Sequence, residues 1–125
     1  MNQFDSIFLV DDDPINNLIN KRLLGKTGVT NVIKEFLDGE YALQVLSTID
    51  PNQQVLIFLD INMPVMNGWD FLDRYMEIFP HRKDTILILS SSIDFQDKQK
   101  AIEYKVVYGF LEKPLTLEKI ESLLI

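Results

Sequence analysis

The most chemically suggestive residues in the sequence are carboxylates that follow apolar runs. Asp11, Asp12 and Asp13 come directly after "IFLV", and Asp60 comes directly after "VLIFL". Adjacent carboxylates repel one another, and burying them is costly unless a cation or hydrogen bonds compensate. Asp13 precedes Pro14, as the capping residue of a helix often does, so we assign Asp13 a structural role. Asp11, Asp12 and Asp60 remain as candidate ligands of a cation.

A hydroxyl group and an ammonium group follow two further apolar runs. Ser90 ends "ILILS", and Lys113 lies in "GFLEKP". Carboxylate oxygens suit a hard cation such as Mg²⁺, which usually keeps some waters and adds phosphate oxygens. This set of groups is poorly equipped for acid–base hydrolysis, but it can neutralise a phosphoryl group and align its transfer. The sequence therefore predicts a magnesium-dependent site for phosphoryl transfer.

Alternating strands and helices are expected to position these groups. Five short apolar runs predict buried parallel strands, and segments of helical period lie between them. The strands are expected at residues 7–10, 32–36, 55–59, 86–89 and 106–111. This alternation implies right-handed crossovers and a doubly wound α/β sandwich of the (βα)5 type. In such a sheet, ligands bind beyond the carboxyl ends of the strands, where the candidate residues stand.

Apolar residues repeat at helical spacing between the expected strands, and each stripe predicts the buried face of a helix. The stripes consist of Ile15, Leu18, Ile19 and Leu23; of Tyr41, Ala42, Val45, Leu46 and Ile49; of Phe71, Leu72, Tyr75, Met76 and Phe79; and of Leu117, Ile120, Leu123 and Leu124. A further helix around residues 94–104 is mostly polar. Asn67, before Gly68, is expected to cap the helix that carries the third stripe.

Length and composition limit the classes of protein to consider. The 125 residues, 46% hydrophobic and 25% charged, suit a single globular domain with one core. The sequence has no cysteine and one histidine, His81, which excludes disulfides and zinc clusters. A net charge of −7 without a basic stripe argues against direct binding of nucleic acid. The partner is therefore expected to be a protein or a cation.

The amino-terminal residues contain no targeting signal. The segment "MNQFDSIFLV" lacks the basic start and the small-residue cleavage site of a signal peptide. No apolar run approaches the ~20 residues that a membrane helix needs. We therefore expect a cytoplasmic protein that does not act in a membrane.

Taken together, the motifs resemble the receiver domain of two-component response regulators. They are Asp11 and Asp12 after the first strand, "LDINMPVMNG" after the third, Ser90 after the fourth and "KP" after the fifth. Each motif is weak alone, but in this order they are specific, and the resemblance covers nearly all of the chain. It implies a flavodoxin-like, CheY-like sheet of five parallel strands in the order 2-1-3-4-5. It also implies one receiver domain over residues 1–125, without an output domain in this chain.

The resemblance assigns roles to the acidic residues. Asp60 would be the phosphoacceptor, which receives a phosphoryl group from the phosphohistidine of a sensor histidine kinase or a histidine phosphotransfer protein. Asp12 would bind Mg²⁺ directly, and Asp11 would bind it mostly through water. The backbone carbonyl of Asn62 would complete the protein ligands. The domain would thus be a signalling module that catalyses only its own phosphorylation and dephosphorylation.

The resemblance also assigns roles to three residues that would read the phosphoryl group. Lys113 would pair with the phosphoryl oxygens, and Ser90 would donate a hydrogen bond to one of them. Phe110 stands at the position of the family's switch aromatic, which controls a surface for a downstream protein. The segment "EYKVVYG" departs from the family, because it replaces a small-residue turn and adds one residue. The resemblance therefore predicts least about the face formed by the fourth helix, the fifth strand and the fifth helix.

A phosphatase of the haloacid dehalogenase superfamily is an alternative. The spacing of Asp11 and Asp13 after a strand resembles its D-x-D motif, with Asp11 as the nucleophile. Ser90 and Lys113 resemble its later motifs. That enzyme needs a further acidic pair, where this chain offers only carboxylates on a helix, and the chain is short for that fold.

A flavin-binding module on the same fold is a second alternative. It needs a phosphate-binding loop rich in hydroxyl groups or glycine after the first strand. This chain instead places carboxylates there, and these would repel a phosphate in the absence of a metal.

Overall fold

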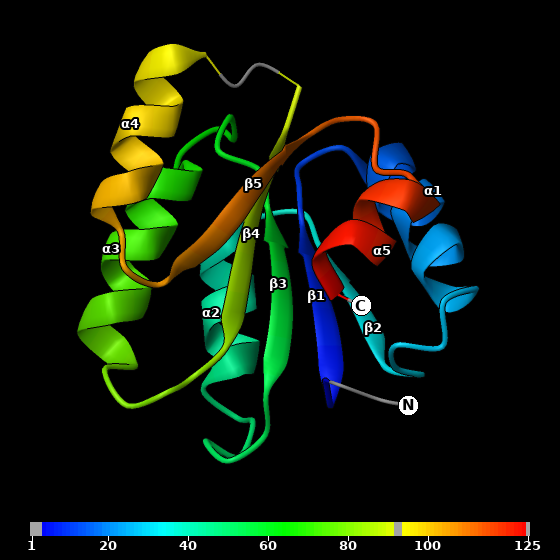
Figure 1. Ribbon diagram of the computed structural model, residues 1–125. Coiled ribbons are helices and arrows are strands. Elements are labelled where there is room, and N and C mark those ends of the chain that lie inside the picture. Colours follow the sequence, from blue (N-terminus) through cyan, green and yellow to red (C-terminus); the bar gives the residue numbers. More distant parts are fainter. Residues whose placement is uncertain (1–3, 92–93, 125) are drawn as a thin grey trace.

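The computed structural model describes residues 4–91 and 94–124, in which strands alternate with helices along the chain (Figure 1). The strands are β1 (Ser6–Val10), β2 (Ile33–Phe36), β3 (Val55–Leu59), β4 (Thr85–Ser90) and β5 (Val107–Glu112). The helices are α1 (Pro14–Gly25), α2 (Gly39–Leu46), α3 (Gly68–Ile78), α4 (Phe95–Glu103) and α5 (Leu117–Leu124). All neighbouring strands pair in parallel, in the order β2-β1-β3-β4-β5. The predicted doubly wound fold and strand order are confirmed.

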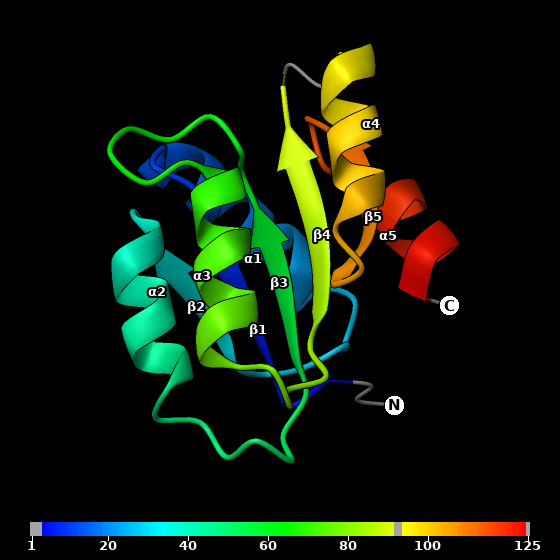
Figure 2. The same cartoon turned by 90° about the vertical axis from the view of Figure 1, so that its left-hand side faces the viewer.

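The two faces of the sheet bury different sets of side chains. On β1, Phe8 and Val10 pack in the core formed with α2 and α3, whereas Ile7 and Leu9 pack in the core formed with α1 and α5. Figure 1 shows α1 and α5 on one side of the sheet and the other helices on the opposite side, and Figure 2 shows α2 and α3 side by side. Because both faces are covered, every residue of β1 and β3 is buried. No helix in the described part of the chain is long and apolar enough to cross a membrane.

Capping side chains fix where the helices begin. The side chain of Asp13 accepts hydrogen bonds from the backbone N–H groups of Ile15 and Asn16, and Pro14 occupies the first turn of α1. Asn67 and Asp70 form a capping box at the start of α3. Both caps had been predicted from the sequence. Each satisfies backbone donors that would otherwise have no partner within the helix.

The predicted buried face of α1 is wrong except at Leu23, which is partly buried against the core. Ile15 and Ile19 are 68% and 57% exposed, and the residues buried on this helix are Asn17, Asn20 and Leu24. The amino-terminal half of α1 lies against the polar end of the sheet, where backbone carbonyl groups require donors. The side-chain amide of Asn17 donates to two of these carbonyls. Hydrogen bonding therefore sets the orientation of this helix, rather than the apolar stripe.

The other stripes are only partly confirmed. Their buried members are Ala42, Leu46, Phe71, Leu72, Tyr75 and Ile120, whereas Tyr41, Met76 and Leu117 are exposed. Ile49 follows the end of α2. The side chains of Leu123 and Leu124 lie outside the described residues. Each helix contacts the sheet on one side only. The set of residues that it buries is therefore narrower than the apolar stripe predicted from the sequence.

The segment "EYKVVYG" runs into a bulge at the start of β5. The residues on either side of Tyr108 lie opposite Ile86 and Leu87, which are consecutive in β4, so Tyr108 has no partner in that register. A bulge of this kind changes which face the residues beyond it point to. Phe110 consequently lies opposite Ile88, on the face that α4 covers. Beyond the bulge, the end of β5 pairs with β4 in regular register.

Aromatic contacts attach α4 to α3. The ring of Tyr104, at the end of α4, stacks on Trp69 with 5.7 Å between the ring centroids, and its hydroxyl donates to Asp73. The ammonium of Lys100 lies 5.1 Å from the centroid of the Trp69 ring. Burial and the hydrogen bond to Asp73 raise the pKa of Tyr104 to about 12. These contacts fix the carboxyl-terminal end of α4 against α3. In the described part of the chain, Ala101 is the one buried residue of this mostly polar helix.

Candidate functional site

Three carboxylates meet at the carboxyl edge of the sheet. Asp11 and Asp60 directly follow β1 and β3, and the backbone N–H of Asp60 donates to the carbonyl of Val10 at 3.0 Å. One carboxylate oxygen each of Asp11, Asp12 and Asp60 lie within 4.8 Å of one another. Asp11 and Asp60 are each only 5% exposed, whereas Asp12 is exposed. The structure therefore brings together the three residues that the sequence marked as cation ligands.

Lys113 joins this cluster from the end of β5. Its backbone N–H donates to the carbonyl of Ser90, and the peptide bond to Pro114 is cis. Its ammonium lies 2.7 Å from Oδ2 of Asp11 and 3.3 Å from Oδ2 of Asp60. Burial by itself lowers the pKa of Lys113, but the hydrogen bond and charge of Asp11, with a smaller contribution from Asp60, outweigh it and raise that pKa. Lys113 is therefore held as a cation between the two carboxylates.

Asp60 lies in a less favourable environment for a charge. Burial raises the pKa of its carboxyl group, and the negative charge of Asp11 adds to this effect. The hydrogen bond from the backbone N–H of Asn62, at 3.0 Å, and the charge of Lys113 lower that pKa in part. A partly desolvated carboxylate with an incomplete set of positive partners is a favourable ligand for a further cation.

Asp11 is fixed by several donors. Besides Lys113, the side-chain amide of Asn16 donates to Oδ2 at 2.7 Å, and the backbone N–H of Asp13 donates to Oδ1 at 2.9 Å. The role of Asn16 was missed from the sequence. Its position five residues after Asp11, on the first turn of a capped helix, is the signal that could have indicated it. These bonds leave Asp12 as the more accessible carboxylate of the adjacent pair.

Asn62 connects Asp60 to Ser90. Its backbone N–H binds the carboxylate of Asp60, and its side-chain amide donates to Oγ of Ser90 at 3.2 Å. Ser90 is completely buried at the end of β4. The resemblance assigned the backbone carbonyl of Asn62 to the metal and did not predict a contact with Ser90. The structure shows that its side chain also holds the hydroxyl group that would have to reach a phosphoryl group on Asp60.

Gly68 lets the loop after Asp60 lie close to α3. A Cβ atom at this position would lie 2.6 Å from Cα of Ile61 and 2.9 Å from the carbonyl oxygen of Asp60. The backbone N–H of Gly68 donates to the carbonyl of Ile61 at 3.1 Å. The position of the candidate phosphoacceptor therefore depends on the absence of a side chain at the start of α3.

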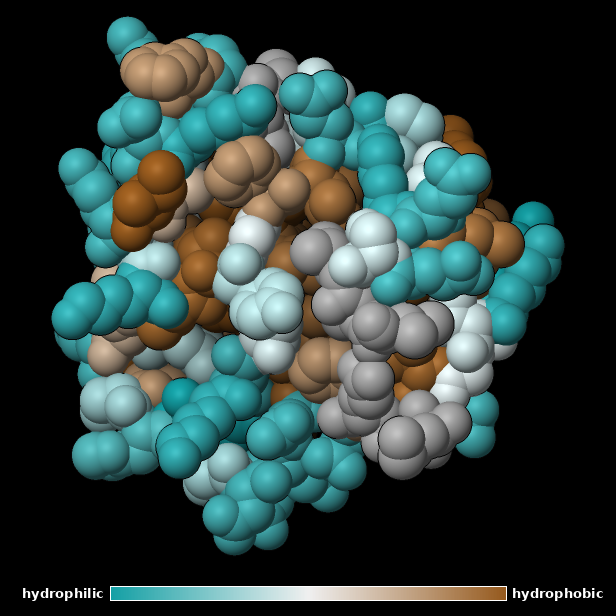
Figure 3. Space-filling view, in the orientation of Figure 1, coloured by the Kyte–Doolittle hydropathy of each residue, from teal (hydrophilic) through white to brown (hydrophobic). Residues whose placement is uncertain are grey.

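Phe110 lies beside the acidic cluster rather than in it. It is on β5, two residues before the one that pairs with Ser90, and it is 37% exposed. The ammonium of Lys98 in α4 lies 5.5 Å from the centroid of its ring. Figure 3 shows apolar side chains gathered in the middle of the face that carries α4 and β5, with hydrophilic ones around them. Phe95, Ile102 and Tyr108 are further exposed apolar residues of these two elements.

The donor set of the cluster fits a hard divalent cation. It consists of carboxylate oxygens, with two of the three carboxylates buried and one accessible from solvent. Such cations prefer oxygen ligands, and the site lies where ligands collect in a doubly wound sheet. The described residues can therefore hold a metal ion at this edge.

The chain is similar in sequence to proteins of two-component signalling. The model of the response regulator receiver domain matches residues 7–125. The chain is 30% identical over 123 residues to the autoinducer 1 sensor kinase/phosphatase LuxN of Vibrio campbellii, covering 98% of this chain and 13% of that protein. It is 30% identical over 100 residues to the nitrate/nitrite response regulator protein NarL of Escherichia coli, covering 71% of this chain and 45% of NarL. The chain thus spans less than half of either relative.

A solved structure agrees with this assignment. A two-component response regulator from Cytophaga hutchinsonii has a TM-score of 0.88 and 32% sequence identity, over 98% of this chain and 95% of that one. The chain therefore belongs to the family of response regulator receiver domains. Receiver domains are signalling domains of two-component systems, in which they interact with histidine kinases.

The phosphatase alternative is not supported. The family match covers nearly the whole chain, and Asp13, the second acid of the D-x-D spacing, is an exposed helix cap. The oxygens of Asp11, its expected nucleophile, are bound by an ammonium, an amide and a backbone N–H.

Proposed function

We propose that Asp60 is the phosphoacceptor of this receiver domain and takes its phosphoryl group from a phosphohistidine. The observation that carries this proposal is the position of its buried carboxylate, 3.3 Å from the ammonium of Lys113 and next to Asp11 and Asp12. A carboxylate is a weak nucleophile, and it becomes effective when positive charge faces the incoming phosphoryl oxygens. In this proposal Asp60 attacks phosphorus, and the bond to the histidine nitrogen of the donor breaks.

Asp11, Asp12 and the backbone carbonyl of Asn62 would hold Mg²⁺, with Asp11 acting mostly through water. The donors already bound to Asp11 support this division, because they occupy both of its oxygens, whereas Asp12 is exposed. When bound, the cation would supply positive charge to the phosphoryl oxygens.

Lys113 and Ser90 would bind the oxygens of the phosphoryl group once it is attached to Asp60. Lys113 already contacts Asp60, so its ammonium needs only a small movement to pair with a phosphoryl oxygen. Ser90 Oγ, held by the amide of Asn62, would turn to donate to another. Phe110, on the same face of the sheet, would follow Ser90 and alter the surface of α4 and β5 that a downstream protein binds.

The exposed apolar residues of α1 provide a surface for the phosphodonor. Ile15, Leu18 and Ile19 face solvent on the helix that begins two residues after Asp12. A sensor histidine kinase or a histidine phosphotransfer protein that docks on them would bring its phosphohistidine close to Asp60. In this proposal residues 1–125 act as one receiver domain in the cytoplasm, where the ATP that charges such donors is made.

Phosphorylation by a small donor tests the role of Asp60. The protein is incubated with acetyl phosphate or phosphoramidate, with Mg²⁺ or with EDTA, and its intact mass is measured. We expect one phosphoryl adduct in Mg²⁺, and none in EDTA or in Asp60→Asn. Asp38→Asn is the matched control, because asparagine caps a helix as well as aspartate does, and it should be phosphorylated normally. An adduct that persists in Asp60→Asn or forms equally well in EDTA would overturn the proposal.

A further inference from the structure

Two asparagine side chains lie buried beneath the acidic cluster. Asn17 and Asn20 are 1% and 3% exposed on the inner face of α1, although the same helix leaves isoleucines in solvent. Burying an amide is unfavourable unless it is fully hydrogen-bonded, so an apolar side chain would cost less at these positions. An amino-terminal half of α1 that buries two amides and leaves two isoleucines exposed therefore indicates that the amides serve the adjacent acidic site.

The side-chain nitrogen of Asn17 is hydrogen-bonded, but its side-chain oxygen is not in the described part of the chain. Its nitrogen donates to the backbone carbonyls of Asp11 and Phe36, at 3.0 and 3.3 Å, and so connects the ends of β1 and β2. Its oxygen Oδ1 is buried, and it has no hydrogen-bond partner in the described part of the chain. A buried acceptor of this kind calls for a donor, and a bound water is the usual one.

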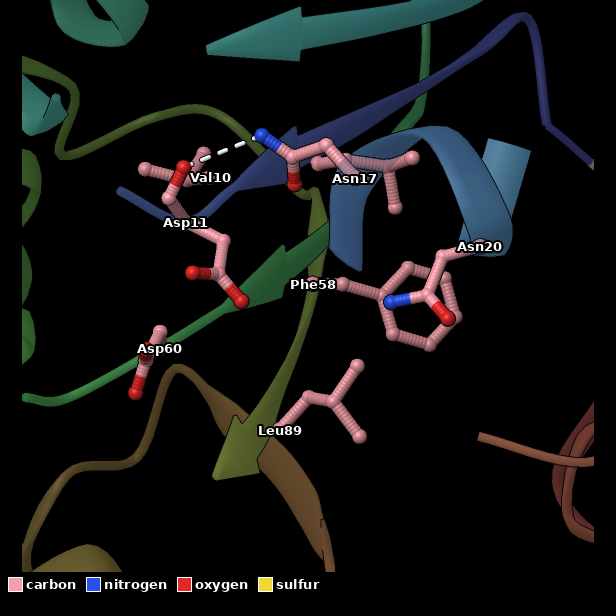
Figure 4. Close-up of a pocket in the computed structure, with 8 residues that line it drawn as sticks. Val10, Asp11, Asn17, Asn20, Phe58, Asp60 and Leu89 are labelled. Carbon is pink, nitrogen blue, oxygen red and sulfur yellow. Dashed lines mark hydrogen bonds between the residues drawn. The ribbon is translucent and has the colours of Figure 1, made fainter. Parts of the chain in front are cut away.

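A small cavity lies next to this acceptor. It has room for about one water molecule, and its polar lining consists of Asp11, Asp60, Asn17 and Asn20. Figure 4 shows the two carboxylates on one side of this space and Asn20, beside Phe58, on the other. A buried water needs two to four polar partners, roughly the number that these side chains supply.

We propose that Asn17 and Asn20 are positioning residues of the acidic site, which hold one water molecule in this cavity and thereby help to fix the carboxylate of Asp11. The water would donate one proton to Oδ1 of Asn17 and the other to the carboxylate of Asp11, and it would accept a hydrogen bond from the amide of Asn20. Asp11 is then fixed at both ends: its backbone by Asn17, and its carboxylate by the water, Lys113 and Asn16. This inference rests on the proposed function, because it assigns the two amides to the site where the cation and the phosphoryl group would bind.

Asn20→Leu separates a positioning role from a purely structural one. Asn20 lines the cavity, and leucine fills a similar space without a polar group. We expect a melting temperature in EDTA that is equal to or above that of the wild type. We also expect Mg²⁺ to bind about tenfold more weakly, the size of effect that is typical when a group supporting a metal ligand is lost. Asn20→Ser provides a hydroxyl group that can donate to the water and leaves room for it, so this variant should retain most of the affinity.

Ser6→Ala is the matched control. Oγ of Ser6 is another buried polar atom without a partner in the described part of the chain, but it lies at the opposite end of β1 from Asp11. Removing it should leave the dissociation constant for Mg²⁺ unchanged. Isothermal titration calorimetry with MgCl₂ gives this constant for each variant, and thermal unfolding in EDTA gives its stability.

The outcomes distinguish this inference from the proposed function. If the folded Asn20→Leu variant binds Mg²⁺ as tightly as the wild type, or if a high-resolution crystal structure of the wild type shows no water in the cavity, the inference is wrong. The proposed function stands in either case, provided that acetyl phosphate labels Asp60. If the wild type itself fails to be labelled at Asp60, the proposed function is wrong whatever the affinities of the variants are.

Discussion

The ammonium of Lys113 lies 2.7 Å from Oδ2 of Asp11, although 102 positions separate the two residues in the chain. The same ammonium is 3.3 Å from Asp60, so one positive charge faces two buried carboxylates, with Asp12 nearby. Negative charge exceeds positive charge in this cluster. The folded domain is therefore built around an excess of negative charge, which a bound cation would relieve.

Replacing Lys113 by methionine should destabilise the domain in the absence of metal. Both buried carboxylates lose their ammonium partner, and hydrogen bonds to charged groups are worth about 1.5–3 kcal/mol. Added Mg²⁺ should recover part of the loss, because the cation supplies positive charge at the same place. Urea unfolding in EDTA and in Mg²⁺ measures both effects. Lys21→Met is the control: its ion pair with Glu35 is long and exposed, so its loss should change the free energy of unfolding by less than about 0.5 kcal/mol.

Replacing Asp60 by asparagine should stabilise the metal-free protein in a pH-dependent way. Because burial raises the pKa of Asp60, the folded state binds this proton more tightly than the unfolded state does. The contribution of Asp60 to stability is then largest below the pKa of the unfolded chain and is lost as the pH rises through the folded-state pKa. In EDTA at pH 7, Asp60→Asn should therefore melt at a higher temperature than the wild type.

The gain from Asp60→Asn should shrink as the pH is lowered towards 4, because the wild-type carboxyl group then takes up its proton. Melting curves from pH 4 to pH 7 test this. Asp38→Asn corrects for the general effect of removing one charge from a protein whose net charge is −7. A difference between Asp60→Asn and the wild type that is independent of pH would contradict the linkage.

The sequence was informative about strands and poor about the faces of helices. Interior strands are buried on both sides, so an apolar run is enough to locate them, and β3 was predicted to the residue. The gathering of the candidate site residues was predictable for a related reason, because polar residues directly after such strands must share one edge of the sheet.

Which helix residues are buried depends on whether the sheet presents apolar side chains or polar backbone groups to each turn of the helix. Near the polar edge of the sheet, the side chain of Asn17 is buried because it donates to backbone carbonyls, whereas Ile15 and Ile19 remain exposed. The spacing of apolar residues cannot indicate this preference. The supporting roles of Asn16 and of the Asn62 side chain were not predicted. Asn16 lies only five residues from Asp11, so its role was within reach of the sequence, whereas the contact of Asn62 with Ser90 joins residues 28 positions apart, which no local pattern encodes.

Gly68→Ala should disturb the Asp60 loop. The new methyl group would lie 2.6 Å from the backbone of Ile61, which cannot yield as the end of a flexible side chain can. We expect a loss of a few kcal/mol in the free energy of unfolding, on the order of that for other overpacked sites, and slower labelling of Asp60 by acetyl phosphate. Gly25→Ala is the control, because its Cβ would have nothing within 4 Å, and alanine should stabilise the end of α1 by roughly 0.5–1 kcal/mol. Equal effects of the two variants would contradict the close approach.

Asp84 holds the end of the sheet opposite the site. Its buried carboxylate accepts from Arg82, from the hydroxyl of Tyr75 and from the backbone N–H of Val55. Arg82 also donates to two backbone carbonyls of the loop between α2 and β3. Asp84→Ala should therefore cost about 3–5 kcal/mol in chemical denaturation, because it leaves a buried guanidinium without its counter-ion.

A second variant separates this unpaired charge from the loss of packing around Asp84. Arg82→Met combined with Asp84→Leu should cost less than Asp84→Ala alone, since it removes both charges together. If the double variant is the less stable of the two, the hydrogen bonds of Arg82 to the loop dominate instead. Labelling of Asp60 should persist in both variants below their melting temperatures.

Phosphorylation should be transmitted from Ser90 to α4 through Phe110. Ser90 is buried and held by Asn62 before phosphorylation, and Phe110 lies on the same face of the sheet with the ammonium of Lys98 over its ring. A phosphoryl group that draws the hydroxyl of Ser90 towards Asp60 would vacate space beside β5. Because phenylalanine has no hydroxyl group, it can move into this space without burying an unsatisfied polar atom.

Amide NMR spectra with Mg²⁺ alone and with Mg²⁺ plus beryllofluoride, a stable mimic of the phosphoryl group, test this transmission. We expect shifts at residues 60–68 and also along residues 94–111, because a ligand changes a conformational equilibrium only through contacts that differ between the two states. In Ser90→Ala the shifts around Asp60 should remain, and those in α4 and β5 should be lost. Lys98→Ala is the control for the cation over the ring, and it should leave the transmission intact while altering the resonances of Phe110. Shifts confined to the loop after Asp60, or equal propagation in Ser90→Ala, would show that another route connects the site to α4.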